Sequence, residues 1–260
     1  IKQLIECSWS NFLGIFSQLL ADFDDEKVVT TCISNILRMA GTCGILHLDT
    51  IEEAFIKTIT NATNVMEGRE INGKNLKCIE ELIDFVINYG KNIRKCWYII
   101  LIVLSKIDFY YSRQIDTDLF AKEIRKKAKL KNPEKELEIE IKNYELLRKY
   151  KFDLKCDTIF SKTTSFEKDS ILNFIQSLCL VSTRELEDYA TPRVYSLHKL
   201  VEVCDFNIFR IQIEWVQIWK LISEFLVKVI TESQQMNIWT DALDLLRQTI
   251  GKLLQKPDLS

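Results

Sequence analysis

The 260-residue sequence predicts an all-α protein, from its composition and from the spacing of its apolar residues. It contains only 7 Gly and 3 Pro, whereas Ile, Leu, Lys and Glu are abundant. Apolar residues recur at steps of three and four, the period of one buried helix face. The expected helix pairs, about forty residues each, predict a right-handed α-solenoid of HEAT- or armadillo-like helix pairs. No strict sequence repeat is visible, so an irregular helical bundle is the alternative.

Residues 1–111 are expected to form N-terminal helical repeats. An apolar stripe over residues 9–20 predicts the first helix. The acids at 22–25 then precede the second helix, where negative charge complements a helix N-terminus. Gly41 and Gly44 are expected to loosen or end this second helix.

A third helix is expected to begin near Asp49, because Asp49 and Glu52 have the spacing of a capping box. A loop over residues 68–73 follows. Two further helices complete this part, and Gly90 separates them.

Residues 112–155 differ from the rest because about half of them are charged. Their composition predicts a charged, flexible connection with helical pieces. The alternative is a basic surface that touches anionic lipid on the cytoplasmic face of a membrane. The residues of that candidate lipid site are Lys122, Arg125, Lys126, Lys127, Lys129 and Lys131.

Residues 156–260 are expected to form C-terminal helical repeats that continue the first ones in a single solenoid. Thr164 or Ser165 would cap the first helix, and Thr191 with Pro192 would begin the next. Three apolar stripes follow, with these expected buried residues: Val194, Leu197, Leu200, Val201, Cys204 and Ile208; Ile211, Trp215, Ile218, Ile222, Phe225, Leu226 and Val229; Trp239, Leu243, Leu246, Ile250 and Leu253.

The same stretch resembles a known family. It carries Pro192-Arg193, Ser196-Leu197, Lys199 through Glu202, Asn207 with Arg210, Trp215 with Trp219, and Asp244 through Gln248. This pattern is similar to the first homology region downstream of the catalytic domain (HDS region) in large Sec-seven-type exchange factors for Arf GTPases, the brefeldin-inhibited Golgi class. The spacing holds over residues 192–248 without a gap. Two positions depart from the family pattern: Thr191 replaces the usual His, and Gln212 replaces a second Arg.

The resemblance implies a non-catalytic regulatory module of an Arf exchange factor. Its expected partners are an Arf-type GTPase in the GTP form and neighbouring domains of the same exchange factor. The module would be cytoplasmic, peripherally attached to Golgi and trans-Golgi membranes, and would control recruitment or autoinhibition of the exchange domain in vesicle trafficking. The alternatives are a structural spacer that forms a homodimer, and a module that binds anionic lipid directly.

The candidate partner-binding residues are Arg193, Lys199, Asn207, Arg210 and Gln212. Two roles are open to Arg side chains near helix ends, including Arg247. They can tie helices together through carboxylates such as Glu202, Glu214 and Asp244, or they can offer a guanidinium fork to a partner.

Charge and motifs argue against several function classes. The formal net charge of −2 argues against nucleic acid as the main partner. The two His, His47 and His198, are far apart, and the sequence has no phosphate loop, metal-spaced cluster or catalytic motif. No catalytic residue, cofactor or metal is therefore expected. The eight Cys fall mostly on apolar faces, which favours reduced, buried thiols over disulfides or zinc, and no apolar run of membrane-spanning length is expected.

Overall fold

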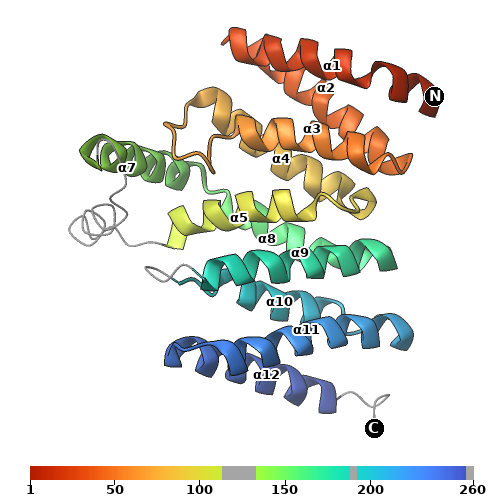
Figure 1. Ribbon diagram of the computed structural model, residues 1–260, viewed down its shortest axis with the longest axis vertical. Helices are drawn as coiled ribbons and strands as arrows, with labels where there is room; N and C mark the ends of the chain where they lie inside the picture. Colours follow the sequence, from red (N-terminus) through yellow and green to blue (C-terminus); the bar gives the residue numbers. More distant parts are fainter. Residues whose placement is uncertain (113–132, 188–191, 256–260) are drawn as a thin grey trace. The chain divides into compact units, whose positions relative to one another are not determined.

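The computed structural model describes residues 1–112, 133–187 and 192–255, and every regular element within these ranges is a helix (Figure 1). The all-α prediction is confirmed. The chain has two compact units, Ile1–Asp157 and Thr158–Ser260, and the division falls inside α8 (Asp153–Lys162). Each unit is described below by itself.

The first unit is built from helix pairs. Helix α1 (Lys2–Asp22) packs on α2 (Glu26–Ile45), and α3 (Asp49–Ala62) packs on α4 (Gly73–Tyr89). In addition α1 contacts α3, α2 contacts α4, and α3 contacts α5 (Trp97–Ser112). Odd-numbered helices therefore pack on one another in one layer, and α2 and α4 form a second layer, as expected for stacked helix pairs.

The predicted acidic residues lie at the N-terminus of α2, and the structure shows in addition that one of them caps the helix. The Asp25 carboxylate accepts hydrogen bonds from the backbone N–H groups of Lys27 and Val28, both at 3.1 Å. After α4, the 3-10 turn η1 (Gly90–Asn92) ends the helix at the expected glycine. These two predictions succeed because the capping groups lie next to the helix in sequence.

The described part of the predicted charged connection is helical. Helix α7 (Pro133–Tyr150) packs on α5. Its Asn143 is 1% exposed and binds the backbone of the loop before α4, accepting from the N–H of Ile71 and donating to the carbonyl of Arg69, both at 2.8 Å. The candidate lipid-binding residues, Lys122 through Lys131, lie outside the described residues.

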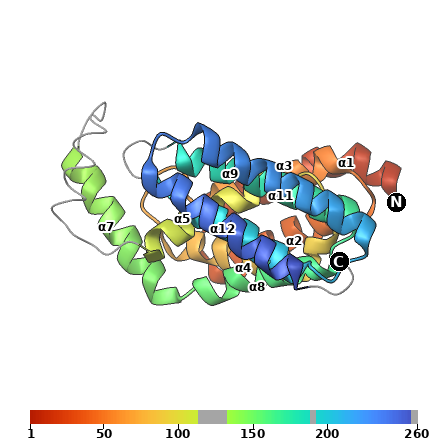
Figure 2. The ribbon, with the colours of Figure 1, turned by 90° about the horizontal axis from the view of Figure 1, so that it is seen from below.

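The second unit has the same two-layer plan. Helix α9 (Lys168–Leu186) packs on α10 (Tyr195–Phe206), and α11 (Gln212–Glu232) packs on α12 (Met236–Leu254). Helix α9 also contacts α11, and α10 contacts α12, an arrangement that can be followed in Figure 1. Figure 2 shows α11 and α12 side by side. The expected core residues of α10 and α11 are confirmed as buried at Leu197, Leu200, Cys204, Trp215, Ile218, Ile222, Leu226 and Val229.

The predicted buried face of α12 is wrong by one residue. The buried positions are Ile238, Ala242, Leu245 and Thr249, whereas the expected stripe from Trp239 to Leu253 is half-buried or exposed. Small side chains at the contact let α12 lie close to its neighbours. The Thr249 hydroxyl is satisfied by donating to the Leu245 carbonyl at 2.9 Å. The spacing of large apolar residues alone therefore predicts the wrong buried face for α12.

Two of the predicted helix starts in the second unit also need correction. Helix α9 has Glu167 at its N-cap, so neither Thr164 nor Ser165 caps it; both lie in the 3-10 turn η2 (Thr163–Ser165). Helix α10 begins at Tyr195, three residues after Pro192. Thr191, the predicted cap, lies outside the described residues.

Helix α2 is long and apolar enough to cross a membrane by length and composition, contrary to the expectation that no run would reach that length. An 18-residue window of α2 has a mean hydropathy of 1.3, and half of this window is buried inside the first unit. Ile33, Ile36, Ala40 and Cys43 have no exposed surface at all. The apolar character of α2 is therefore explained by its place in the core between α1, α3 and α4.

Helix α2 ends at Ile45, one residue after Gly44, which agrees with the prediction, whereas Gly41 lies inside the helix and does not end it. A Cβ atom at Gly41 would lie 3.2 Å from the Tyr89 ring. At Gly44 it would lie 2.9 Å from Glu52 Oε1 and 3.1 Å from the Asn92 carbonyl oxygen. Both glycines therefore allow a close approach between α2 and its neighbours, which a larger residue would prevent.

Glu52 does not form the predicted capping box, because it is 1% exposed and the N-cap of α3 is Leu48. Its carboxyl lies against Gly44 and the Cys96 thiol, and neither oxygen has a hydrogen bond of ordinary geometry. Burial, and then the neighbouring Asp49 carboxylate, raise its pKa to about 8, and the Cys96 thiol and Arg94 offset this only in part. At neutral pH, Glu52 is therefore mainly a neutral carboxylic acid in the core.

We predict that Glu52→Gln stabilises the protein increasingly as the pH rises from about 4.5 to about 8. The folded-state pKa of Glu52 lies above its ordinary value of 4.5, so the proton on Glu52 stabilises the folded chain. That stability is complete below the ordinary pKa and is lost as the pH rises through the folded value, by up to about 1.4 kcal/mol per pH unit. Gln does not titrate, so the difference from wild type should grow over this window and then level off.

Urea unfolding at a series of pH values measures this difference. Glu53→Gln, at the exposed neighbouring position, is the matched control and should show no such growth. A difference between Glu52→Gln and wild type that does not depend on pH would contradict the neutral, buried carboxyl.

The two kinds of glycine environment give a second prediction. Gly44→Ala should destabilise the protein by about 1–3 kcal/mol, because the new methyl group has no room beside Glu52 and Asn92. Gly14→Ala, in α1, should stabilise it by up to about 1 kcal/mol, since nothing lies within 4 Å of the new Cβ atom. Thermal unfolding compares the two, and a Gly44→Ala variant as stable as wild type would argue against the close approach.

Candidate functional site

The second unit contains two turns that lie against each other. One is η2, between α8 and α9, and the other joins α10 and α11 at residues 207–211. Backbone carbonyls in such turns have no helical partner, and burying them without a donor costs free energy. A side chain from the second turn supplies these donors.

The donor is Arg210, whose guanidinium binds both turns. Its Nη2 atom donates to the carbonyls of Thr163 at 2.9 Å and Phe166 at 2.6 Å. Its Nη1 atom donates to Glu214 Oε2 at 2.9 Å, and its Nε atom to Asn207 Oδ1 at 2.6 Å. The Arg210 side chain is only 12% exposed. Arginine suits this position because its donors form a rigid, planar fork.

Asn207 completes the contact between the turns. It is the C-cap of α10 and is 1% exposed. Its amide nitrogen donates to Thr163 Oγ1 at 2.9 Å and to the Val203 carbonyl at 2.8 Å, while its amide oxygen accepts from Arg210. We call Thr163, Phe166, Asn207, Arg210 and Glu214 the turn tether.

A second polar contact fixes the start of α10. Glu185 of α9 has a side chain 2% exposed, and its carboxylate accepts from the Ser196 backbone N–H at 2.9 Å and from the Ser196 hydroxyl at 2.8 Å. Arg193 Nη2 lies 3.5 Å from Glu185 Oε1. A carboxylate from another helix therefore caps the positive end of α10.

The remaining two candidate residues differ in exposure. Lys199 is 9% exposed, donates to Glu202 at 2.8 Å and 3.0 Å, and lies over the rings of Phe160 and Tyr195. Gln212 is exposed at the start of α11. Lys199 therefore stabilises the packing of α10, while Gln212 faces solvent.

The five candidate residues are not all in contact with one another. Asn207 and Arg210 meet in the turn tether, whereas Arg193 lies at the other end of α10, which has 12 residues and so spans about 18 Å. The tethering role expected for such arginines is present at Glu214, and Arg247 lies 3.8 Å from Asp244 on the surface. Binding of a partner by these residues stays a prediction.

Sequence reasoning missed a group of exposed apolar side chains beside the turn tether. The exposed fractions are 86% at Phe209, 65% at Ile211, 66% at Ile213 and 54% at Val216. We call these four residues the apolar ridge. Ile211 was expected in the core; it is instead the N-cap of α11, with extended backbone, so its side chain leaves the buried face. Ile213 and Val216 are out of phase with the buried stripe of α11, so the spacing of apolar residues in the sequence could have predicted that these two are exposed.

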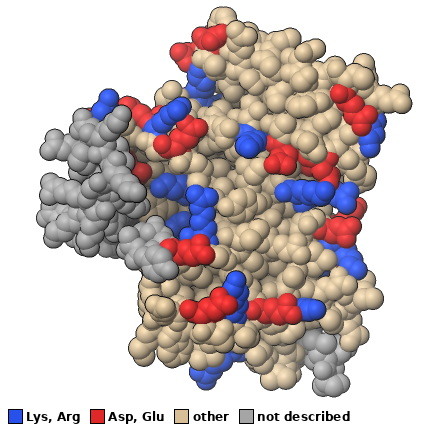
Figure 3. All heavy atoms as spheres, viewed as in Figure 1, with Lys and Arg blue, Asp and Glu red and all other residues tan. Residues whose placement is uncertain are grey.

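Charged side chains of both signs are interspersed on the face drawn in Figure 3, among wide uncharged areas.

Both histidines are paired: His47 lies 3.2 Å from Arg94 Nη1 in the first unit, and His198 lies 2.7 Å from Asp241 in the second. All eight cysteines are free thiols; Cys32, Cys43 and Cys204 are buried as expected, and Cys179 is half-buried. In the described ranges, no three His, Cys, Asp or Glu side chains are grouped so that they could hold a metal ion.

Comparison with known proteins identifies relatives over the whole chain, although no protein-family model matches. The chain is 25% identical to brefeldin A-inhibited guanine nucleotide-exchange protein 1 of Arabidopsis thaliana. It is 27% identical to the ADP-ribosylation factor guanine nucleotide-exchange factor sec72 of Schizosaccharomyces pombe, and 24% identical to SEC7 of Saccharomyces cerevisiae, an exchange factor of the same description. In each case the whole of this chain is covered, but only 15–18% of the relative.

The chain is thus related to one region of these large exchange factors. The resemblance read from the sequence is confirmed at that level.

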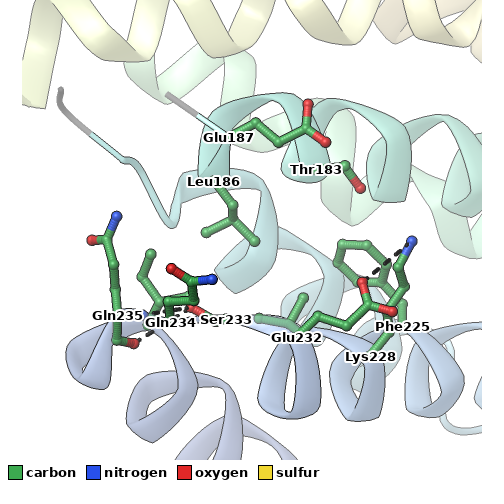
Figure 4. A pocket seen from close by; sticks show the side chains of 11 residues that line it. Thr183, Leu186, Glu187, Phe225, Lys228, Glu232, Ser233, Gln234 and Gln235 are labelled. Atoms are coloured by element: carbon green, nitrogen blue, oxygen red, sulfur yellow. Dashed lines mark hydrogen bonds and ion pairs between the residues drawn. The ribbon is translucent and has the colours of Figure 1, made fainter. Parts of the chain in front are cut away.

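This exchange-factor-like region also has a hollow of about 350 Å³ in its second unit (Figure 4). Its walls come from the last turns of α9 and α11 and from the turn that leads into α12. Leu186, Phe225, Val229 and Ile238 supply apolar surface, and Lys228 lies 3.9 Å from Glu232 at the rim. The Thr183 hydroxyl is engaged by donating to the Cys179 carbonyl at 3.0 Å. The lining therefore combines apolar side chains with polar groups that are partly paired within the protein.

The turn tether gives a prediction about stability. Arg210→Ala should lower the free energy of unfolding by roughly 2–4 kcal/mol, because it removes hydrogen bonds to Glu214, to the Phe166 carbonyl and to the Thr163 carbonyl, which keeps only the Phe166 N–H as a donor. Arg247→Ala is the matched control, since that side chain is exposed; its effect should stay within about 0.5 kcal/mol. Urea unfolding measures both, and equal losses would show that Arg210 does not stabilise the fold through these bonds.

Proposed function

We propose that this chain is a non-catalytic regulatory region of a large ADP-ribosylation factor exchange factor, equivalent to the first HDS region, and that it binds the GTP form of an ADP-ribosylation factor. The observation that carries the proposal is similarity over the whole chain to several such exchange factors, of which the chain spans 15–18%. Two of these relatives are named as guanine nucleotide-exchange factors for ADP-ribosylation factors. A region of such a protein can regulate that activity by binding the product of the reaction.

The arrangement of polar groups is in keeping with a binding role. The turn tether and the Glu185 contact are occupied by bonds within the second unit. Such groups hold helix ends in place and thereby fix the shape of the outer surface. Helical-repeat proteins commonly use a surface fixed in this way to bind other proteins.

Regulation by this route requires a preference for one nucleotide state. A region that binds the GTP and GDP forms equally would not respond to exchange at all, because a ligand shifts an equilibrium only through its differential affinity. With a preference for the GTP form, newly activated GTPase on the membrane would recruit more exchange factor. We propose that this occurs on the cytoplasmic side of Golgi and trans-Golgi membranes, in vesicle trafficking, and that the region also contacts neighbouring domains of its own chain and thereby controls the exchange domain.

A flotation experiment tests the proposal. The purified 260-residue chain is mixed with vesicles that carry a membrane-anchored ADP-ribosylation factor loaded with either GTP or GDP, and with bare anionic vesicles. We expect the chain to float with the GTP-loaded vesicles at least about tenfold more than with the other two, the ratio that a preference of about 1.4 kcal/mol gives.

Two results would contradict the proposal. Equal recruitment to bare anionic vesicles would assign the chain to lipid binding, and this binding should then weaken at high salt. No recruitment under any condition, together with a dimer by light scattering, would favour the structural spacer.

A further inference from the structure

The apolar ridge is an unusual surface because it is both exposed and held in place. Single exposed apolar residues are common on proteins, but four within residues 209–216, each more than half exposed, form a local concentration. They flank Arg210, whose side chain points into the protein and binds the neighbouring turn. Within residues 209–216, the single basic side chain, Arg210, therefore points inward, and the four apolar side chains are exposed to solvent.

The turn tether fixes the backbone that carries the ridge. Arg210 binds the carbonyls of Thr163 and Phe166, and Asn207 binds the Thr163 hydroxyl, so the turn at 207–211 is held to η2 by side chains of both residues. Its backbone is closed as well, because the Arg210 N–H donates to the Asn207 carbonyl at 3.0 Å. A rigid apolar surface loses little conformational entropy when it binds, which is the property of a preformed recognition surface.

The charges around the ridge favour a protein partner over a membrane. Attraction to an anionic bilayer needs a cluster of Lys and Arg. In the two turns, residues 162–169 and 205–214, the basic side chains are Lys162, Lys168 and Arg210, and the acidic ones are Glu167, Asp169, Asp205 and Glu214, so three positive against four negative groups give a formal charge of −1. Arg210 is itself paired with Glu214. An apolar surface without excess positive charge around it suits an apolar patch on a folded protein.

We infer that the apolar ridge is the surface through which this region contacts the GTP form of an ADP-ribosylation factor, with Arg210 and Asn207 as positioning residues behind it. This rests on the proposed function for the identity of the partner, while the place of contact rests on the structure. It also moves the contact from the side chains of Asn207 and Arg210 to their apolar neighbours.

The test is a binding measurement without vesicles. The triple variant Phe209→Ser, Ile211→Ser, Ile213→Ser replaces the three most exposed of the four ridge residues. The matched control is Val227→Ser, Met236→Ser, Leu254→Ser, which removes comparably exposed apolar side chains elsewhere on the second unit. Wild type and both variants are titrated with an ADP-ribosylation factor loaded with a non-hydrolysable GTP analogue. We expect the ridge variant to bind roughly tenfold or more weakly, and the control to bind within about twofold of wild type.

All substituted positions are exposed, and Ser is a favourable residue at the N-cap of α11, so neither variant should have a markedly lower thermal unfolding midpoint than wild type. Wild-type binding that the ridge variant retains would overturn the inference and leave the proposed function intact. Failure of wild type to bind would overturn the proposed function itself.

Two further outcomes assign the ridge to another occupant and also overturn the inference. One is binding to bare vesicles that the ridge variant loses. The other is self-association of wild type, by sedimentation, that the ridge variant lacks and the control variant keeps.

Discussion

Buried backbone carbonyls at the ends of helices must find donors, and the second unit depends on one guanidinium for this. Arg210 binds the carbonyls of η2, the cap of α10 and the first turn of α11. The helices of this unit are joined by short turns, so their relative positions follow from how those turns meet. A Lys could not replace Arg210, because a single ammonium group lacks the planar fork of donors that reaches several acceptors at once.

The all-α class and most helix faces could be predicted from sequence because they follow from a local period. Leu197, Leu200 and Leu226 are buried as the spacing requires. Helix starts were less predictable where the capping group comes from elsewhere. Asp25 caps α2 from the adjacent position and belongs to the acids that the sequence places at this helix start, whereas Glu185 caps α10 across 11 residues and a turn. The face of α12 was misplaced because Ala242 and Thr249 are buried although neither is a large apolar residue.

The candidate site shows the same division. Arg210 and Glu214 are four residues apart in the sequence, so their pairing on a helix can be predicted from that spacing. The contacts of Arg210 with Thr163 and Phe166 cross more than forty residues and end on backbone atoms, which carry no sequence signal. The apolar ridge was overlooked for another reason. The apolar spacing assigns Ile211 to the core, and only the fold shows that its side chain is exposed, whereas Ile213 lies outside the expected stripe.

The buried Glu52 changes how the charge of this protein should be counted. The formal net charge of −2 treats every Asp and Glu as ionised. With its pKa raised to about 8, Glu52 keeps its proton in the folded chain at pH 7, so the folded molecule carries a net charge of about −1 there. Unfolding would release that proton and increase the negative charge. The native and denatured forms should therefore differ in isoelectric point, with the native form focusing at the higher value.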